Sequence, residues 1–303
     1  MAVAFLPIRL YVGIMRMTTA TARLLVLLLG GHIINAPAQV SGIMGTRLDV
    51  DIYGNIFILD AERNTLRKYS RDEVLVREVG GPGWQDGQFD RPSGIWARNG
   101  IDIFVADYGN HRIQRFDRTL SFVSSLSTRD SDNPDERFGY PTDVALSRLG
   151  ELFICDGENS RIVKVNRLSQ VERTFGGFGA GEGRLRNPEG VEIGPGDNVY
   201  VQDGDRIVVF DTFGNFIDDL YPGMFRKPSC LFADQNGVAV VDDTTLYCFD
   251  THNRPEVALS LPRLLGRAIP ECRSIAFSVG NLFVLTNEGL MIVPDPRPEK
   301  SLK

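Results

Sequence analysis

Residues 105–117 read VADYGNHRIQRFD, and this stretch has the pattern of a β-hairpin. An apolar run ends at Asp107, a polar turn follows, and a second run alternates in the way expected of a strand. The same pattern recurs along the chain, and the residues that end the first strand of each hairpin are Asp60, Asp107, Asp156, Asp203, Asp242 and Thr286. Units of this length, six in number, predict six propeller blades.

Each unit can be extended to four strands. A short apolar strand precedes the hairpin, introduced by Pro92, Pro141, Pro188 or Pro228 in four of the units, and a looser β-rich segment follows it. The predicted fold class is therefore all-β, a six-bladed β-propeller of four-stranded antiparallel blades. The sixth unit stops after its third strand at Val293, and residues 39–44 are the candidates for its fourth strand.

The repeated unit resembles the NHL repeat. It has a Gly-rich, Phe-containing link at residues 80–89, a Pro-led inner strand, and a strand that ends in Asp before a Gly-Asn-x-Arg-Ile turn. The closest agreement is at Asp107, Gly109, Asn110, Arg112, Ile113, Asp156, Asn159, Arg161 and Ile162. The resemblance covers about residues 45–293 and implies a propeller of the NHL type. It implies less about function, because propellers support many unrelated activities.

The N-terminal residues 1–38 contain basic but no acidic side chains. Residues 17–38 have the layout of a signal peptide, with Arg23, an apolar core and the sequence Ala36-Pro37-Ala38 before Gln39; residues 1–16 would be an unused upstream start. The apolar core is short for a membrane span, which needs about 20 residues. We expect an exported, periplasmic or extracellular protein without a transmembrane span when mature; a retained N-terminal anchor is the alternative.

The mature chain is expected to form one domain. Residues 39–293 would be the propeller, and residues 294–303 a frayed tail. The formal net charge is −6 and becomes −9 when the three arginines of residues 1–38 are removed. An acidic balance disfavours a nucleic-acid partner, because binding to phosphates depends on basic side chains.

Four cysteines raise the question of a disulfide. Cys230 and Cys248 lie on two strands of one blade with a strand between them, so they should be about 9–10 Å apart, too far for a bridge. Cys272 is the better partner for Cys230. Buried free thiols are the favoured interpretation, because free cysteine is among the most buried residue types.

The repeated acidic and basic residues favour a structural role. A carboxylate at the end of a strand can accept hydrogen bonds from turn amides, and an arginine on the returning strand can pair with it. The residues concerned are Asp60, Asp107, Asp156, Asp203, Arg112, Arg161 and Arg206.

A ligand site is expected where residues differ between blades at equivalent positions, at the start of the inner strands. The candidates for this channel mouth are Arg47, Ser93, Asp143, Glu189, Ser229 and Arg273. Taken alone, these side chains favour a wet channel rim without a ligand over a ligand contact. In the links between blades, Trp84 and Phe178 are expected to pack between blades rather than to anchor a partner.

Enzymes of similar fold imply other residues. Peptidyl-α-hydroxyglycine lyases hold zinc with histidines, but the only histidines here are His32, His111 and His252. Streptogramin lyases need a channel histidine, which no inner strand supplies. Gluconolactonase-like and paraoxonase-like propellers bind calcium, for which Asp143 and Glu189 are weak candidates.

The sequence therefore favours an exported, non-catalytic binding scaffold that needs no cofactor. Its ligand would be a protein, a peptide or an envelope polymer such as a polysaccharide, bound on the loop face and at the channel mouth. The alternatives are a calcium-dependent hydrolase or lyase and an RNA-binding NHL module. The oligomeric state is left open.

Overall fold

The computed structural model describes residues 28–29, 32–33 and 41–298. The chain divides into two compact units, Met1–Ala36 and Pro37–Lys303. In the described part of the first unit, β1 (Leu28–Leu29) pairs antiparallel with β2 (His32–Ile33). The predicted cleavage site before Gln39 and nearly all of the predicted signal peptide lie outside the described residues.

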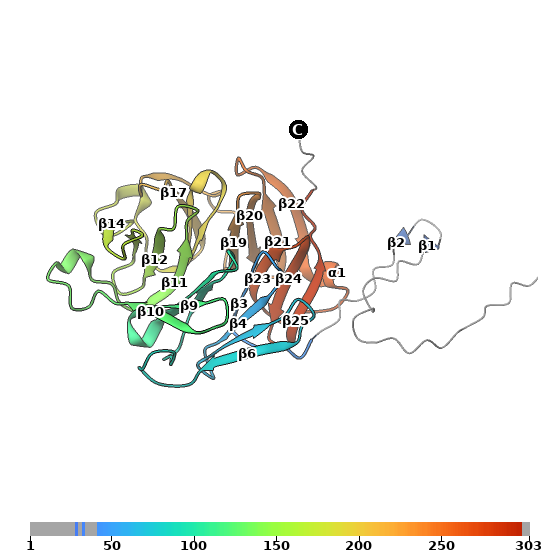
Figure 1. Cartoon of the computed structure of the whole chain (residues 1–303). Helices are drawn as coiled ribbons and strands as arrows, with labels where there is room; N and C mark the ends of the chain where they lie inside the picture. Colours follow the sequence, from blue (N-terminus) through green and yellow to red (C-terminus); the bar gives the residue numbers. More distant parts are fainter. Residues whose placement is uncertain (1–27, 30–31, 34–40, 299–303) are drawn as a thin grey trace, which may run out of the picture. The chain divides into compact units, whose positions relative to one another are not determined.

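The second unit is a ring of antiparallel sheets (Figure 1). Blade one contains β3 (Arg47–Val50), β4 (Ile56–Asp60), β5 (Thr65–Tyr69) and β6 (Leu75–Gly80). Blade two contains β7 (Gly94–Trp96), β8 (Asp102–Asp107), β9 (Arg112–Asp117) and β10 (Phe122–Leu126). Blade three contains β11 (Pro141–Leu146), β12 (Leu152–Asp156), β13 (Arg161–Val165) and β14 (Val171–Phe175).

Blade four contains β15 (Pro188–Ile193), β16 (Val199–Asp203), β17 (Arg206–Phe210) and β18 (Phe216–Asp219). Blade five contains β19 (Pro228–Asp234), β20 (Gly237–Asp242), β21 (Thr245–Phe249) and β22 (Pro255–Ser260). Blade six contains β23 (Cys272–Ser278), β24 (Asn281–Thr286) and β25 (Gly289–Pro294). The helical segments are α1 (Leu261–Leu265), η1 (Tyr108–Asn110), η2 (Pro134–Glu136), η3 (Gly181–Gly183) and η4 (Pro195–Asp197).

The strands follow chain order across each blade, and the first strand of each blade is the innermost one. Each inner strand contacts that of the next blade, and β23 of blade six contacts β3 of blade one, so the ring closes. The prediction of an all-β, six-bladed propeller is confirmed.

Blade six has three strands among the described residues. The Ser41 amide donates a hydrogen bond of 3.0 Å to the carbonyl of Leu290 in β25, and Ile43 is buried in the adjoining core. Residues 41–43 therefore lie beside the third strand, where a fourth would pair. Residues 39–40 of the predicted closing segment lie outside the described residues.

The apolar core lies between the blades. The ring of Phe175 in blade three is 6.4 Å from that of Phe153 in the same blade and 5.0 Å from that of Phe210 in blade four. All three rings are at least nine-tenths buried. Alternating strand residues thus place apolar side chains on the sheet faces, and the blades pack through these faces.

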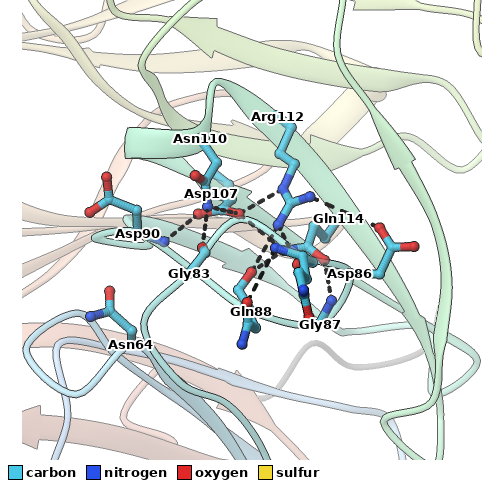
Figure 2. Close-up of polar contacts among 12 residues, drawn as sticks. Asn64, Gly83, Asp86, Gly87, Gln88, Asp90, Asp107, Asn110, Arg112 and Gln114 are labelled. Atoms are coloured by element: carbon cyan, nitrogen blue, oxygen red, sulfur yellow. Dashed lines mark hydrogen bonds and ion pairs between the residues drawn. The ribbon is translucent and has the colours of Figure 1, made fainter.

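Asp107 anchors the link that leads into blade two (Figure 2). Its fully buried carboxylate accepts hydrogen bonds from the Asp90 amide (2.8 Å) and from the side chains of Asn110 (2.9 Å), Arg112 (2.8 Å) and Gln114 (3.0 Å). Arg112 also donates to the carbonyls of Gln85 (2.8 Å) and Gln88 (3.0 Å). The Asp107 carboxylate and the Arg112 guanidinium therefore join the hairpin turn to the link at residues 81–91.

The other repeated aspartates make similar contacts. The Asp–Arg pairs are Asp60 with Arg67 (3.0 Å), Asp107 with Arg112 (2.8 Å), Asp156 with Arg161 (2.9 Å) and Asp203 with Arg206 (3.0 Å). In blade five, Asp242 accepts bonds from the amides of Arg226 (3.1 Å) and Lys227 (2.7 Å). These residues hold links in place and lie outside the central cavity described below.

The prediction that Trp84 and Phe178 pack between blades is wrong. Their side chains are 78% and 85% exposed. In the same two links, Phe89 and Leu185 take the buried positions instead. Each link therefore buries one apolar side chain, and Trp84 and Phe178 remain in solvent.

The C-terminal tail is more ordered than predicted up to residue 298. Arg297 forms an ion pair with Asp234 of blade five at 3.3 Å, and its guanidinium lies 4.0 Å from the centre of the Phe277 ring. A cation held over an aromatic face is stabilised by the ring's electron density. The prediction of fraying from residue 294 is therefore corrected for residues 294–298; residues 299–303 lie outside the described part.

Candidate functional site

Five of the six predicted mouth residues line one central cavity. It has a volume of about 60 Å³, enough for a few waters or a small charged group. Its polar lining consists of Arg47, Arg98, Asp143, Glu189, Glu192, Gln202, Ser229, Arg273 and Ser274, together with the backbone of Gly190. The sixth predicted residue, Ser93, is not part of the lining; its hydroxyl donates to the Pro141 carbonyl at 2.8 Å and ties blade two to blade three.

Asp143 lies on β11 between the inner strands of its two neighbours. Its Oδ2 accepts a hydrogen bond from the Val191 amide of blade four at 3.1 Å. On the other side, a Cβ atom at Gly94 of blade two would lie 2.2 Å from Oδ1, so only glycine leaves room for this carboxylate. Burial raises the pKa of Asp143 to about 6, although the hydrogen bonds and Arg47 act in the opposite direction.

Arg98 crosses the channel from the end of β7. Its guanidinium donates to Asp49 of blade one (3.2 Å), to Glu192 of blade four (2.5 Å) and to the Ala233 carbonyl of blade five (2.6 Å). It also lies 4.3 Å from the centre of the Phe232 ring. Burial alone would lower the pKa of Arg98, but the two carboxylates raise it above its ordinary value. One side chain thus connects four blades.

Glu192 has one oxygen paired and one without a partner. Oε1 accepts from Arg98, whereas the buried Oε2 has no hydrogen-bond partner among the described residues. The residue is 8% exposed and lines the cavity. Burial raises the pKa of Glu192 to about 8, against the effect of Arg98, and the nearby carboxylates of Asp143 and Asp49 add to the rise. The side chain is therefore mostly protonated at neutral pH.

The remaining mouth residues are held by their neighbours. Glu189 accepts from the side-chain amides of Asn187 (2.6 Å) and Gln202 (3.3 Å). Arg273 donates to the Gly45 carbonyl (3.1 Å), and Arg47 donates to the Arg273 carbonyl (3.5 Å), so these two arginines bridge blades six and one. The rim of the cavity is therefore fixed before any ligand binds.

Sequence reasoning missed Asp49, Arg98 and Glu192. Asp49 and Glu192 gave a usable signal, because each is a charged residue between two apolar residues of its strand. Arg98 gave none, since it follows a strand and its position across the channel depends on the geometry of four blades.

The described residues contain no group of three or more His, Cys, Asp or Glu side chains placed to hold a metal ion. Asp143 and Glu189, the calcium candidates, both line the cavity but are not part of such a group. In the described part of the chain, no helix is long and apolar enough to cross a membrane.

The raised pKa of Glu192 predicts a pH dependence of stability. The folded protein holds this proton up to a pH of about 8, whereas the unfolded chain releases it near 4.5, so stability from this group is lost as pH rises towards 9. Between pH 6 and 9 the loss should be about 2–3 kcal/mol. Urea titrations at several pH values should show this decline in the wild type, and Glu192→Gln should remove it. Parallel profiles for the two proteins would contradict the assignment.

Sequence comparison identifies a known repeat in blade three. Residues 138–165, which contain β11 to β13, match the NHL repeat model. The chain is 30% identical over 139 residues to the protein brain tumor of Drosophila melanogaster, covering 45% of this chain and 13% of that protein. It is 35% identical over 114 residues to a probable peptidyl-alpha-hydroxyglycine alpha-amidating lyase of Caenorhabditis elegans, covering 35% and 31%.

A third similar protein is the human NHL repeat-containing protein 3, with 26% identity over 40% of each chain. The matches thus span less than half of each of these relatives. Among solved structures, a gluconolactonase from Xanthomonas campestris has a TM-score of 0.61 at 12% identity, covering 86% of this chain and 95% of that one. A streptogramin B lyase has a TM-score of 0.56 at 16% identity, covering 81% of this chain and 77% of that one. At these identities the likeness shows the fold alone.

Proposed function

Since the chain is a six-bladed β-propeller that carries an NHL repeat, we propose that it is a non-catalytic binding protein that holds a positively charged group of its ligand in the central cavity. The ligand would be a protein, a peptide or an envelope polymer bearing that group. Export, predicted from residues 17–38, belongs to the same proposal.

The unpaired oxygen of Glu192 carries the proposal. A buried carboxylate oxygen without a partner is costly, and nine-tenths or more of buried polar groups in proteins are hydrogen-bonded. Because Glu192 lines the cavity, a donor placed there can supply the missing bond. A cationic donor would form the stronger, charge-assisted bond.

The charge around the cavity favours a cation over an anion. Three carboxylates and three arginines line it, and a fourth carboxylate, Asp49, is paired with Arg98. When Glu192 is ionised, this group carries an excess of one negative charge. A proton or a bound cation can neutralise it, so a cation should bind by displacing the Glu192 proton.

The rest of the ligand could contact the links that precede the inner strands. The links at residues 81–91 and 176–187 lead into the inner strands β7 and β15, which contribute Ile95 and Glu189 to the cavity lining. Trp84 and Phe178 are exposed on these links, and Arg184 lies 4.5 Å from the centre of the Phe178 ring. Exposed aromatic side chains of this kind often carry binding energy at interfaces.

A primary ammonium ion is the simplest probe of the proposal. Butylammonium should raise the melting temperature of the propeller at pH 8 in a concentration-dependent way, because a ligand that binds only the folded state stabilises it. Butanol, which has the same chain without the charge, should have no effect. Glu192→Gln should abolish the shift, while Glu158→Gln on the outer surface should retain it. Equal shifts with butylammonium and butanol would contradict the proposal.

A calcium-dependent hydrolase or lyase is the second candidate, favoured by the position of Asp143 and Glu189 in the same cavity. The same melting experiment distinguishes the two. The binding proposal predicts that neither EDTA nor calcium chloride changes the melting temperature. A rise with calcium that is lost in Asp143→Asn would move the function to the metal-dependent class.

A further inference from the structure

Two buried thiols face one another across the boundary between blades five and six. Cys230 is on β19 and Cys272 is on β23, the inner strands of these blades. Their Sγ atoms are 3.4 Å apart, and the residues are 5% and 2% exposed. Both are free thiols in the structure. The distance is short enough for a bond to form after a small movement of the side chains.

We propose that Cys230 and Cys272 form a disulfide that joins blades five and six, by exchange with a small organic disulfide that enters through the central cavity. Cys230 is part of the cavity lining, so of the two thiols it is the one that faces the cavity. Cys272 is not part of the lining, so it acts as the second thiol.

The exchange has two balanced steps. The thiolate of Cys230 attacks one sulfur of the reagent, the reagent's S–S bond breaks, and the released small thiolate takes up a proton. The thiolate of Cys272 then attacks Sγ of Cys230, and the second small thiol leaves. The two protein thiols lose two electrons and two protons in total, and one reagent disulfide is reduced to two thiols.

The surroundings of the pair favour Cys230 as the first nucleophile. The hydrogen bond with Cys272 lowers the pKa of Cys230 and raises that of Cys272, and Arg47 also stabilises the Cys230 thiolate. For the other two cysteines, burial outweighs the lowering effects of Thr142 on the pKa of Cys155 and of Arg297 on that of Cys248. Burial raises the pKa of Cys248 to about 12 and raises that of Cys155 well above its usual range. Thiolate character therefore distinguishes this pair from the remaining thiols.

The disulfide would reinforce a particular part of the ring. The two cysteines are 42 residues apart, and β23 belongs to the three-stranded blade that closes the propeller. A cross-link over a loop of this length limits the unfolded chain and so stabilises the folded one. The melting temperature should rise by on the order of 5 °C.

The test uses the propeller incubated with 2-hydroxyethyl disulfide, followed by blocking of free thiols and peptide mapping. We expect a linked peptide pair containing Cys230 and Cys272, a mass loss of two hydrogen atoms, and the rise in melting temperature. Cys155→Ala and Cys248→Ala should give the same link. Cys272→Ser should give no internal link and no rise.

Three results would overturn the proposal. The first is that both thiols stay free in the folded protein under these conditions. The second is that Cys230 is linked to Cys248 or to a second molecule instead. The third is that Cys272→Ser shows the same thermal rise as the wild type, which would assign the rise to another reaction. None of these results depends on whether the cavity binds a cation.

Discussion

Replacing Arg98 by leucine should lower the free energy of unfolding by about 3–5 kcal/mol, the cost of breaking a buried ion pair from one side. The side chain forms an ion pair with Asp49 and a hydrogen bond with Glu192, and these residues are 2% and 8% exposed. Leucine keeps part of the apolar contact with Phe232 but offers no donor. Asp49, Glu192 and the Ala233 carbonyl would then lose the donor that they share. Urea denaturation followed by tryptophan fluorescence measures the change.

The matched control is Arg148→Leu. Arg148 is an exposed arginine in the turn after β11, and surface substitutions usually change stability by less than about 0.5 kcal/mol. Raising the pH should increase the cost of Arg98→Leu further, because Glu192 then carries its charge without its hydrogen-bonded cationic partner. If the two arginine variants were equally stable, the cross-channel role of Arg98 would be refuted.

Replacing Asp107 by alanine should cost about 3 kcal/mol or more. Its carboxylate is fully buried, accepts four hydrogen bonds and neutralises Arg112, which is itself 9% exposed. Without it, a buried guanidinium and a buried amide lose their partner. Thermal and urea denaturation should both report the loss, and the link at residues 81–91 should become more sensitive to proteolysis.

Asp242→Ala is the matched control for this prediction. Asp242 occupies the equivalent position in blade five, but it is half-buried and accepts hydrogen bonds from the backbone amides of Arg226 and Lys227 instead of pairing with an arginine of the described residues. Its loss should cost on the order of 1 kcal/mol. A cost for Asp107→Ala no larger than that for Asp242→Ala would show that the arginine pairing contributes little.

The fold could be predicted because the same hairpin pattern recurs along the chain. The hairpin at residues 105–117 recurs, and in each copy an Asp or Thr ends the second strand of the blade. Side chains alternate along each strand, so the apolar ones lie on the faces that pack between blades. The three strands that blade six has among the described residues were also predicted, since residues 294–303 contain no β-rich segment. Residues 39–44 were likewise predicted to close the ring, but the specific pairing of Ser41 with Leu290 was not.

The candidate site could be predicted only in part. Counting positions on the inner strands located Arg47, Asp143, Glu189, Ser229 and Arg273 at one cavity, because equivalent positions in a ring converge. The same counting included Ser93, whose hydroxyl turns to the next blade. It missed Arg98, whose reach across the channel depends on side-chain length and on partners in three other blades.

Trp84 and Phe178 show a different limit of sequence reasoning. An aromatic residue in a link can be buried or exposed, and the choice depends on which link residue first reaches the gap between blades. Phe89 and Leu185 occupy those gaps. The side chains of Trp84 and Phe178 therefore remain on the surface. They were predicted to be buried, and they are now candidate contacts for the ligand.

The central claim is that the cavity takes a cation in place of the Glu192 proton, and calorimetric titration with butylammonium tests it most directly. The account predicts binding that tightens between pH 7 and pH 9, where butylammonium stays charged while Glu192 ionises, and a proton released on binding at pH 7. Glu192→Gln should show neither effect. Binding of the same strength at both pH values, without proton release, or equal binding to Glu192→Gln, would contradict the claim.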